Sequence, residues 1–345
     1  MQLNNELINK IKITPIIDSL RLENIDDDEY FSEKYSNYIS NSRLGLLKSK
    51  GAKAFFEGIK SEYNPSFQFG TWLHEQVLQP ESFNIVEGIY KPTAKAGLMA
   101  DYLYKNVVSK DGGTPSDDQI KSASYIIGYY KDKLTSNRLN EFRLKSENYW
   151  RDRYIFEQTK GVDSKRVYVD EKSHILIKNC LNSINSNNEI QKLLHPKGIV
   201  EDPYVGFESA ILLDIEMTVP EHGSQVYRLK AKLDNFSIDK EENIITVNDL
   251  KTTSKLANEF DPDYYSYQRE IAGYTYLLNL CAKKFFEIEK PTNKGNFLVV
   301  SIIPEYNSCV VPMTNKMFTK GWNEYKFLLK TVAYLNLVEG YNFAS

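Results

Sequence analysis

A change of hydrophobic periodicity near residue 204 constrains the fold of this chain more than any other feature. From there on, apolar and polar residues alternate with a period of two and β-branched residues are frequent, which is typical of strands. The pattern predicts strands over residues 204–219, 226–238 and 244–251, joined by polar turns at 221–224 and 239–243. Because these turns are short, the three strands should lie side by side as an antiparallel meander.

The rest of this half of the chain mixes helices and strands. We expect a helix from Pro262 to about Cys281, strands near 295–303 and 308–312, and a closing helix over 314–337. This order of elements indicates an α/β core.

The first 200 residues are predicted to be mostly helical. We expect helices at 41–47, capped by Asn41 or Ser42, at 70–78, at 119–134 behind the cap and acids of 115–118, at 171–186, and at 188–194. The predicted organisation is therefore a helical N-terminal part over residues 1–200 and a core over residues 201–345, together forming one compact domain.

Composition excludes several classes of protein. The 345 residues are 41% hydrophobic and 26% charged, as in folded soluble domains. A net charge of −3 argues against a protein that coats DNA electrostatically, but it is compatible with one local basic groove. Cys180, Cys281 and Cys309 have no metal-ligand spacing, which excludes a zinc finger or a four-cysteine cluster and suggests a reducing compartment.

No apolar run approaches the roughly 20 residues that would span a membrane. The first residues, Met-Gln-Leu-Asn-Asn-Glu, also lack the basic and apolar regions of a signal peptide. We therefore expect a cytoplasmic location and no membrane partner.

Charged residues gather at the ends of the second and third predicted core strands. One face of the second strand carries Arg228, Lys230, Lys232 and Asp234, and the opposite face carries Leu229, Ala231 and Leu233. On the third strand, Asp249 and Lys251 lie two residues apart and therefore share a face. A hairpin can bring Asp234 beside them.

These residue types suit a metal ion that acts on a phosphodiester. Mg²⁺, for which Mn²⁺ can substitute, prefers oxygen ligands and keeps several waters, so Asp234 and Asp249 are candidate ligands. Lys251 could orient a water molecule or stabilise a phosphate transition state, and Arg228, Lys230 and Lys232 could follow a DNA backbone. The alternative is a surface hairpin on which acids and bases merely pair.

Four segments, taken together, resemble the PD-(D/E)XK nuclease superfamily, and more narrowly phage and prophage exonucleases related to exonuclease VIII and the RecB nuclease domain. Residues 38–47 look like the early "S-x-S-x-L" helix, and residues 69–83 look like the "G-T-x-x-H-x-x-x-L-x-P-E-x-F" signature. Residues 232–234 with 249–253 resemble the "D…(D/E)-x-K-T-T" pair, and Tyr265 to Gln268 the following "Y-x-x-Q" helix.

The resemblance implies a role for each matching residue. His74 would complete a metal site with Asp234 and Asp249, Lys251 would be the catalytic lysine, and Gln268 would organise the site or contact DNA. Glu208 stands roughly where related enzymes carry another acid. The sequence departs from the family pattern at Leu233, which replaces the proline before the first acid. It departs again at Asp249, which is one methylene shorter than the more common glutamate.

Two of these residues also fit ordinary structural roles. His74 lies among apolar helix residues, so packing alone could explain it, and Gln268 could be a solvated helix residue.

The family further implies a restriction-endonuclease-like fold with a mixed central sheet flanked by helices. It also implies Mg²⁺-dependent degradation of double-stranded DNA ends in the 5′→3′ direction, during phage recombination or replication. A single-strand annealing protein and a homo-oligomer are the implied partners besides DNA. Two alternatives remain open: an endonuclease of the same superfamily, and a catalytically inactive DNA-binding or virion protein that keeps the fold.

Overall fold

The computed structural model describes residues 3–58, 65–80, 84–86, 91–129, 134–159, 166–169, 171–196, 204–264 and 266–343, with backbone alone at 65–68, 84–86, 159 and 166–168. The chain divides into two compact units. The sheet unit comprises Met1–Gly70 and Cys180–Ser345, and the helical unit comprises Thr71–Asn179. This division falls elsewhere than the boundary that we expected near residue 200, because an N-terminal segment contributes to the sheet.

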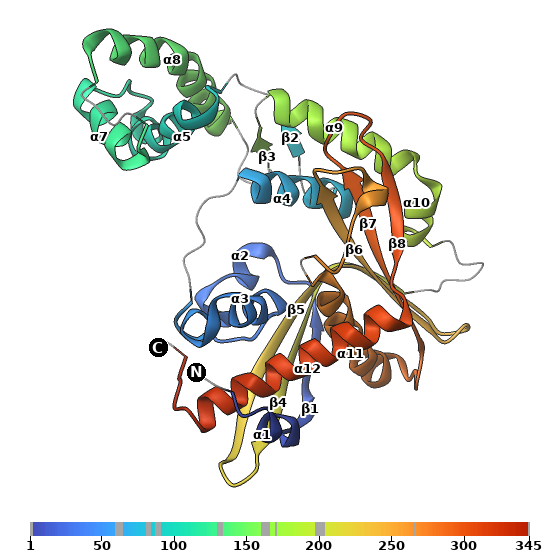
Figure 1. Ribbon diagram of the computed structural model, residues 1–345. Coiled ribbons are helices and arrows are strands. Elements are labelled where there is room, and N and C mark those ends of the chain that lie inside the picture. Colours follow the sequence, from blue (N-terminus) through green and yellow to red (C-terminus); the bar gives the residue numbers. More distant parts are fainter. Residues whose placement is uncertain are drawn as a thin grey trace. The chain divides into compact units, whose positions relative to one another are not determined.

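A six-stranded mixed sheet with the order β1-β4-β5-β6-β7-β8 forms the centre of the sheet unit (Figure 1). Its strands are β1 (Lys12–Glu23), β4 (Tyr204–Val219), β5 (Gly223–Asp239), β6 (Ile244–Thr253), β7 (Thr292–Ser301) and β8 (Ser308–Pro312). Neighbouring strands are antiparallel except for β6 and β7, which are parallel. The predicted α/β core with a mixed sheet is thereby confirmed.

Strand β1 corrects the prediction that the N-terminal part is mostly helical. It pairs with β4, and its register shifts between Ile16 and Arg21. Within the strand, Leu20 alone is classed as buried, so the alternation that identifies a strand from sequence is weak. Pro15 is compatible with this position because β1 is an edge strand of the sheet.

Helices of the sheet unit are α1 (Asn5–Lys10), α2 (Asp27–Tyr30), α3 (Asn41–Glu57), α10 (Asn188–Leu194), α11 (Tyr267–Phe286) and α12 (Asn315–Leu337), with 3-10 turns η1 (Glu33–Tyr35) and η3 (Ala257–Glu259). Figure 1 shows α12 running beside α11, and it also contacts α3, β4 and β5. The main core lies between these helices and the sheet and includes Leu44, Leu229, Val247, Leu278 and Val332.

Glycine allows α11 and α12 to approach closely. A Cβ built on Gly321 would lie 2.2 Å from the backbone oxygen of Gln268, and one on Gly273 would lie 2.7 Å from the ring of Tyr325. Both contacts are shorter than real Cβ atoms tolerate, so this crossing requires glycine at the two positions.

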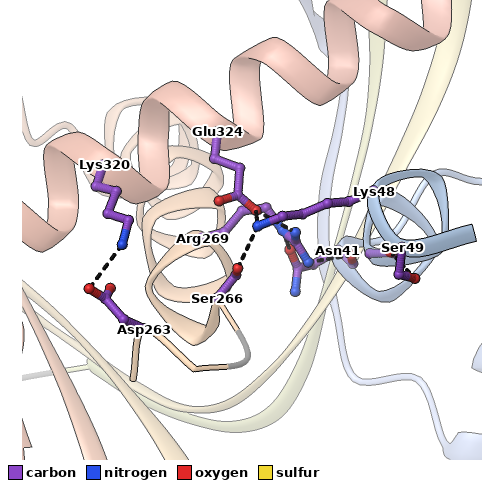
Figure 2. Close-up of polar contacts among 9 residues, drawn as sticks. Asn41, Lys48, Ser49, Asp263, Ser266, Arg269, Lys320 and Glu324 are labelled. Carbon is purple, nitrogen blue, oxygen red and sulfur yellow. Dashed lines mark hydrogen bonds and ion pairs between the residues drawn. The ribbon is translucent and has the colours of Figure 1, made fainter. Parts of the chain in front are cut away.

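A polar cluster joins α3, α11 and α12 at one end of this crossing (Figure 2). Arg269 donates to Asn41 Oδ1 at 2.8 Å and to Glu324 Oε1 at 2.7 Å, and Lys48 donates to the same Glu324 oxygen at 3.0 Å. The Arg269 side chain is only 6% exposed. Because breaking a buried ion pair leaves an uncompensated charge, this cluster fixes the rotation of α11 against its neighbours.

The helical unit has its own core. Its elements include α5 (Ala94–Leu103), the π-turn η2 (Tyr104–Val108), α6 (Ser109–Asp111), α7 (Asp117–Ile127), α8 (Ser136–Thr159) and the short parallel pair β2 (Asn84–Val86) and β3 (Arg166–Tyr168). Met99, Leu103, Ile120, Phe142 and Trp150 pack together. Two helices, α4 (Pro65–Leu78) and α9 (Glu171–Ser186), each have residues in both units.

Several helix boundaries differ from the predicted ones. Ser40, rather than Asn41 or Ser42, caps α3, which continues to Glu57 across a non-helical Gly51. Ser116 forms the predicted cap of α7 as a capping box, but this helix ends at Ile127 because Gly128 adopts a left-handed conformation with φ of 63°.

Helix α11 begins at Tyr267 rather than at Pro262, since the residue before it, Ser266, has a φ of 57°. Helices α9 and α10 and strand β4 have the predicted bounds. Among the described residues, none of the helices combines the length and apolar character needed to cross a membrane.

Candidate active site

Three acidic residues come from three adjacent strands at one level of the sheet. Glu208 lies opposite Asp234, because the residues on either side of each form β4–β5 pairs (Phe207 with Asn235, Ser209 with Leu233). Asp249 follows Asn248, the last residue of β6 paired with β5, and so stands at the next position beside Asp234. We call Glu208, Asp234 and Asp249 the acidic row.

At the acidic row the β4–β5 pairing is interrupted at Glu208 and the β5–β6 pairing ends. Glu208 has a φ of 46°, which is uncommon for a residue with a side chain. Beyond the Asn235–Asn248 pair the β5–β6 ladder ends, and Asp234 Oδ2 instead accepts a hydrogen bond of 2.8 Å from the backbone N–H of Leu250. In a regular ladder the N–H of Leu250 would donate to a backbone carbonyl of the neighbouring strand, but here it donates to the Asp234 carboxylate. Strands β5 and β6 separate from this point.

A chain of buried asparagines lies directly beside the acidic row. Asn296 donates to Asn248 at 2.8 Å, Asn248 donates to Asn235 at 2.7 Å, and Asn235 donates to the carbonyl of Gly206 at 3.3 Å. These side chains are at most 8% exposed. Because buried amides are costly unless they are hydrogen-bonded, the chain ties β5, β6 and β7 together next to the site.

Two carboxylates of the row are close enough to share one cation. Carboxylate oxygens of Glu208 and Asp234 lie within 4.8 Å of each other. Lys232 Nζ lies 3.2 Å from Glu208 Oε2 and also pairs with Asp27 of α2. The two acids therefore form a partly compensated negative site that offers oxygen ligands.

Lys251 is held between two carboxylates and an aromatic ring. Its Nζ lies 2.8 Å from Asp249 Oδ2, 3.5 Å from Glu270 Oε2 and 5.0 Å from the ring centroid of Tyr267. Glu270 in turn accepts a hydrogen bond of 2.9 Å from the Tyr274 hydroxyl. The side chains of Lys251, Asp249 and Glu270 are 17%, 3% and 20% exposed, so the ammonium is fixed in a largely dry environment.

Burial and mutual repulsion shift the pKa values of the row upward. Burial is the main cause that raises the pKa of Asp234 to about 6, that of Glu208 to about 7 and that of Asp249 to about 8. Neighbouring carboxylates add to each shift, and Lys251 or Lys232 opposes it. Buried acids that resist ionisation in this way would be stabilised by a divalent cation among them.

The pKa of Glu270 is shifted downward, in contrast to the pKa values of the acidic row. Burial by itself would raise its pKa, but Lys251, the Tyr274 hydroxyl and Arg269 together lower it below the usual value. The pKa of Lys251 is raised well above its usual value, although burial opposes this, because Asp249, Glu270 and Asp234 surround it. Glu270 and Lys251 are therefore both charged at neutral pH.

The structure brings together Asp234, Asp249, Lys251 and Glu208 of the predicted site. His74 lies in α4, in the part of that helix that belongs to the helical unit, and its side chain is half-buried. Gln268 is fully buried, and neither atom of its amide group has a hydrogen-bond partner among the described residues. Gln268 is therefore not a solvated helix residue. Tyr265 and residues 81–83 of the family segments lie outside the described residues.

The three basic residues predicted to contact DNA, Arg228, Lys230 and Lys232, have different surroundings. Lys230 donates to the backbone oxygen of Tyr30 at 2.8 Å and lies over that ring, and Lys232 has the carboxylate partners given above. Arg228 is exposed, and its guanidinium lies 5.8 Å from the ring centroid of Tyr38 at a polar hollow of about 330 Å³. Lys230 and Lys232 thus have internal partners, and contact of these three residues with DNA stays a prediction.

Sequence reasoning missed Glu270, Tyr274 and the asparagine chain. Tyr267, Glu270 and Tyr274 have the spacing i, i+3, i+7, which places them on one face of a helix. That spacing could have identified the face of α11 that contacts Lys251. It could not have identified the strand that the helix covers.

No protein-family model matches this chain, and no curated protein matches it. Among solved structures, it is similar to a protein from Eubacterium rectale described as a "putative exonuclease". The two chains are 11% identical, with a TM-score of 0.37, and the likeness covers 92% of this chain and 88% of the other.

Proposed function

We propose that this protein is a metal-dependent deoxyribonuclease. The observation that carries the proposal is the acidic row Glu208, Asp234 and Asp249, with the Lys251 ammonium held 2.8 Å from the last of these acids. Carboxylates that converge from adjacent strands beside a fixed cation suit the hydrolysis of a phosphodiester. An ordinary salt-bridged hairpin would leave the acids exposed, whereas Asp249 is buried.

The residues present fit a hard divalent cation. Glu208 and Asp234 offer oxygen ligands within 4.8 Å of each other, Asp249 stands beside them in the row, and Mg²⁺ or Mn²⁺ prefers such ligands. The resemblance of the segment around His74 to the family signature supports this histidine as a further ligand. When bound, the ion would offset charge on the phosphate and make water a better nucleophile.

The chain's own residues would orient the substrate. The Lys251 ammonium, packed against the Tyr267 ring, can donate to a non-bridging phosphate oxygen and favour the extra negative charge of the transition state. Gln268 has a buried amide without a hydrogen-bond partner among the described residues. Such a group is suited to organising the site, which is one of the roles that the "Y-x-x-Q" resemblance implies.

The finer proposal is an exonuclease that degrades one strand of double-stranded DNA ends in the 5′→3′ direction. It rests on the order of the four family segments across residues 38–268. We propose on the same ground a role in phage recombination or replication, an annealing protein as partner, and assembly into a homo-oligomer.

A digestion series on end-labelled DNA tests both levels of the proposal. Linear duplexes labelled at the 5′ or 3′ end, and circular plasmid, are incubated with the protein and Mg²⁺, Mn²⁺ or EDTA. We expect linear DNA to be degraded from its 5′ ends, circular plasmid to stay intact, and EDTA to stop the reaction. Asp249→Ala should be inactive, while Glu216→Gln, which removes an exposed acid from the same strand as Glu208, should be fully active.

The outcomes separate the alternatives. Cleavage of circular plasmid would replace the exonuclease by an endonuclease. The absence of cleavage of any DNA in the presence of metal would favour a catalytically inactive DNA-binding protein. Full activity of Asp249→Ala would exclude the acidic row as the site.

A further inference from the structure

Lys251 and a metal ion would compete for the same carboxylate. Lys251 Nζ donates a hydrogen bond of 2.9 Å to Asp249 Oδ1 and lies 2.8 Å from Oδ2, so the ammonium is close to both oxygens. Oδ2 is buried and accepts no hydrogen bond from the described residues. A carboxylate paired in this way is a poor ligand for a second cation, because the two positive charges repel each other at short range. For Asp249 to coordinate a metal ion, another group must attract the Lys251 ammonium away from it.

Glu270 is placed to do this. Its Oε2 lies 3.5 Å from Lys251 Nζ, on the side of the ammonium that faces α11. A lysine ammonium has three N–H donors, so Glu270 can take one of them while Asp249 takes another. The 3.5 Å separation is longer than a strong ion pair, which leaves room for the ammonium to move towards Glu270.

Glu270 is itself held in position from two sides. The Tyr274 hydroxyl donates to Glu270 Oε1 at 2.9 Å, which leaves Oε2 directed to Lys251. The next residue back, Arg269, points to Asn41 and Glu324, where Figure 2 shows it joining α3 and α12. These contacts fix the rotation of α11, so the position of Glu270 is set by helix packing and does not depend on Asp249.

We propose that Glu270 is a positioning residue that holds the Lys251 ammonium and thereby releases Asp249 to bind the metal ion. The inference rests on the proposed function, since it assigns the roles of lysine and metal ligand to Lys251 and Asp249. It adds a residue from α11 for which neither the strand motif nor the "Y-x-x-Q" pattern accounts.

Calorimetric titration of the full chain with Mn²⁺, in the absence of DNA, tests this role without relying on cleavage. In Glu270→Gln the ammonium loses the carboxylate that would draw it from Asp249, so we expect Mn²⁺ to bind about tenfold more weakly, the effect of one charged hydrogen bond. The same substitution in a Lys251→Met background should change Mn²⁺ affinity by less than about twofold, because there is no ammonium left to hold.

A tenfold loss in both backgrounds would overturn the proposal, because Glu270 would then act on the ion directly. Unchanged Mn²⁺ binding in Glu270→Gln would overturn it as well. Tyr274→Phe should weaken Mn²⁺ binding in the same direction and by a smaller factor.

Cleavage gives a second readout that a merely structural role would not produce. Raising the Mn²⁺ concentration should restore the rate of Glu270→Gln towards that of the unmodified protein, but it should not restore Lys251→Met. Glu289→Gln is the matched control, since it removes an exposed carboxylate that pairs with Lys283 at the surface. It should leave both Mn²⁺ affinity and the cleavage rate unchanged.

These experiments distinguish a failure of the proposed nuclease function from a failure of the proposed role of Glu270. If the unmodified protein neither binds Mn²⁺ nor cleaves DNA, the proposed function fails. If it does both and Glu270→Gln behaves identically, only the positioning role of Glu270 fails.

Discussion

Asp234 accepts a hydrogen bond from the backbone N–H of Leu250 at the point where β5 and β6 separate. The carboxylate thereby has two functions that can be tested independently. It satisfies a backbone donor that the ladder no longer pairs, and it places an acidic oxygen beside Glu208.

Asp234→Asn and Asp234→Ala should therefore differ in stability and agree in activity. The amide oxygen of asparagine can still accept from Leu250, and it removes a buried charge, so we expect Asp234→Asn to be at least as stable as the unmodified protein. Alanine leaves the Leu250 N–H unpaired and should cost about 1–3 kcal/mol. Neither variant should cleave DNA. Urea unfolding and the digestion assay measure the two effects, and normal cleavage by Asp234→Asn would contradict the assignment.

Metal-free protein should become less stable as the pH rises from about 5 to about 8. The pKa values of Asp234, Glu208 and Asp249 are raised to about 6, 7 and 8, so the folded state binds more protons than the unfolded state in this range. Stability is then lost as the pH rises through these values. Mn²⁺ should remove or reverse the trend, because it favours the ionised carboxylates.

Thermal unfolding in EDTA at several pH values measures this effect. Asp249→Asn should flatten the dependence, whereas Glu216→Gln should leave it unchanged. A free energy of unfolding that rises steadily from pH 5 to pH 8 in EDTA would show that the pKa values of the acidic row are not raised in the folded protein.

Asn248 should matter for stability far more than an exposed asparagine of the neighbouring strand. Asn248→Ala removes the hydrogen bonds to Asn235 and Asn296 and leaves buried amide groups without partners, which we expect to cost about 2–4 kcal/mol. Asn293→Ala, at an exposed position of β7, should change stability by less than about 0.5 kcal/mol. Equal effects of the two substitutions in urea unfolding would mean that the asparagine chain contributes nothing.

Gly321→Ala should destabilise the protein by forcing α12 away from α11. The added methyl group would meet the backbone oxygen of Gln268 at 2.2 Å, and overpacking of this kind typically costs about 1–3 kcal/mol. By contrast, a Cβ on Gly70 meets nothing within 4 Å, so Gly70→Ala in α4 should be neutral or stabilising by about 0.5–1 kcal/mol. Thermal unfolding compares the two, and a stable Gly321→Ala would show that the helices can separate without cost.

Arg228 and Lys232 should respond differently to removal of their charge. Arg228 is exposed and forms no ion pair among the described residues, so Arg228→Ala should weaken DNA binding. The slope of the logarithm of the binding constant against the logarithm of the salt concentration should fall by about one, the value for one lost phosphate contact. Lys232 neutralises Glu208 and Asp27, so Lys232→Ala should mainly lower stability. Fluorescence anisotropy with labelled DNA at several salt concentrations distinguishes the two, and an unchanged slope for Arg228→Ala would remove it from the DNA-contacting surface.

Much of the sheet unit could be predicted from the sequence because its strands have a clear period-two pattern. Strands β4, β5 and β6 were recognised in this way, together with the shared face of Asp249 and Lys251. Strand β1 was missed, since it is an edge strand with little burial. The contacts of Lys230 with Tyr30 and of Lys232 with Asp27 could not be foreseen either, because these partners lie about 200 residues away in the chain.

By itself, the sequence determined which residues share a face within one strand, and hence that Asp249 and Lys251 project together and that a hairpin could bring Asp234 beside them. Only the tertiary structure decided that Glu208 joins their row and that Glu270 approaches Lys251 from α11. The reason is physical: the alternation of side chains within a strand is a local property of the backbone. The register between strands and the rotation of a helix depend on packing between segments far apart in the chain.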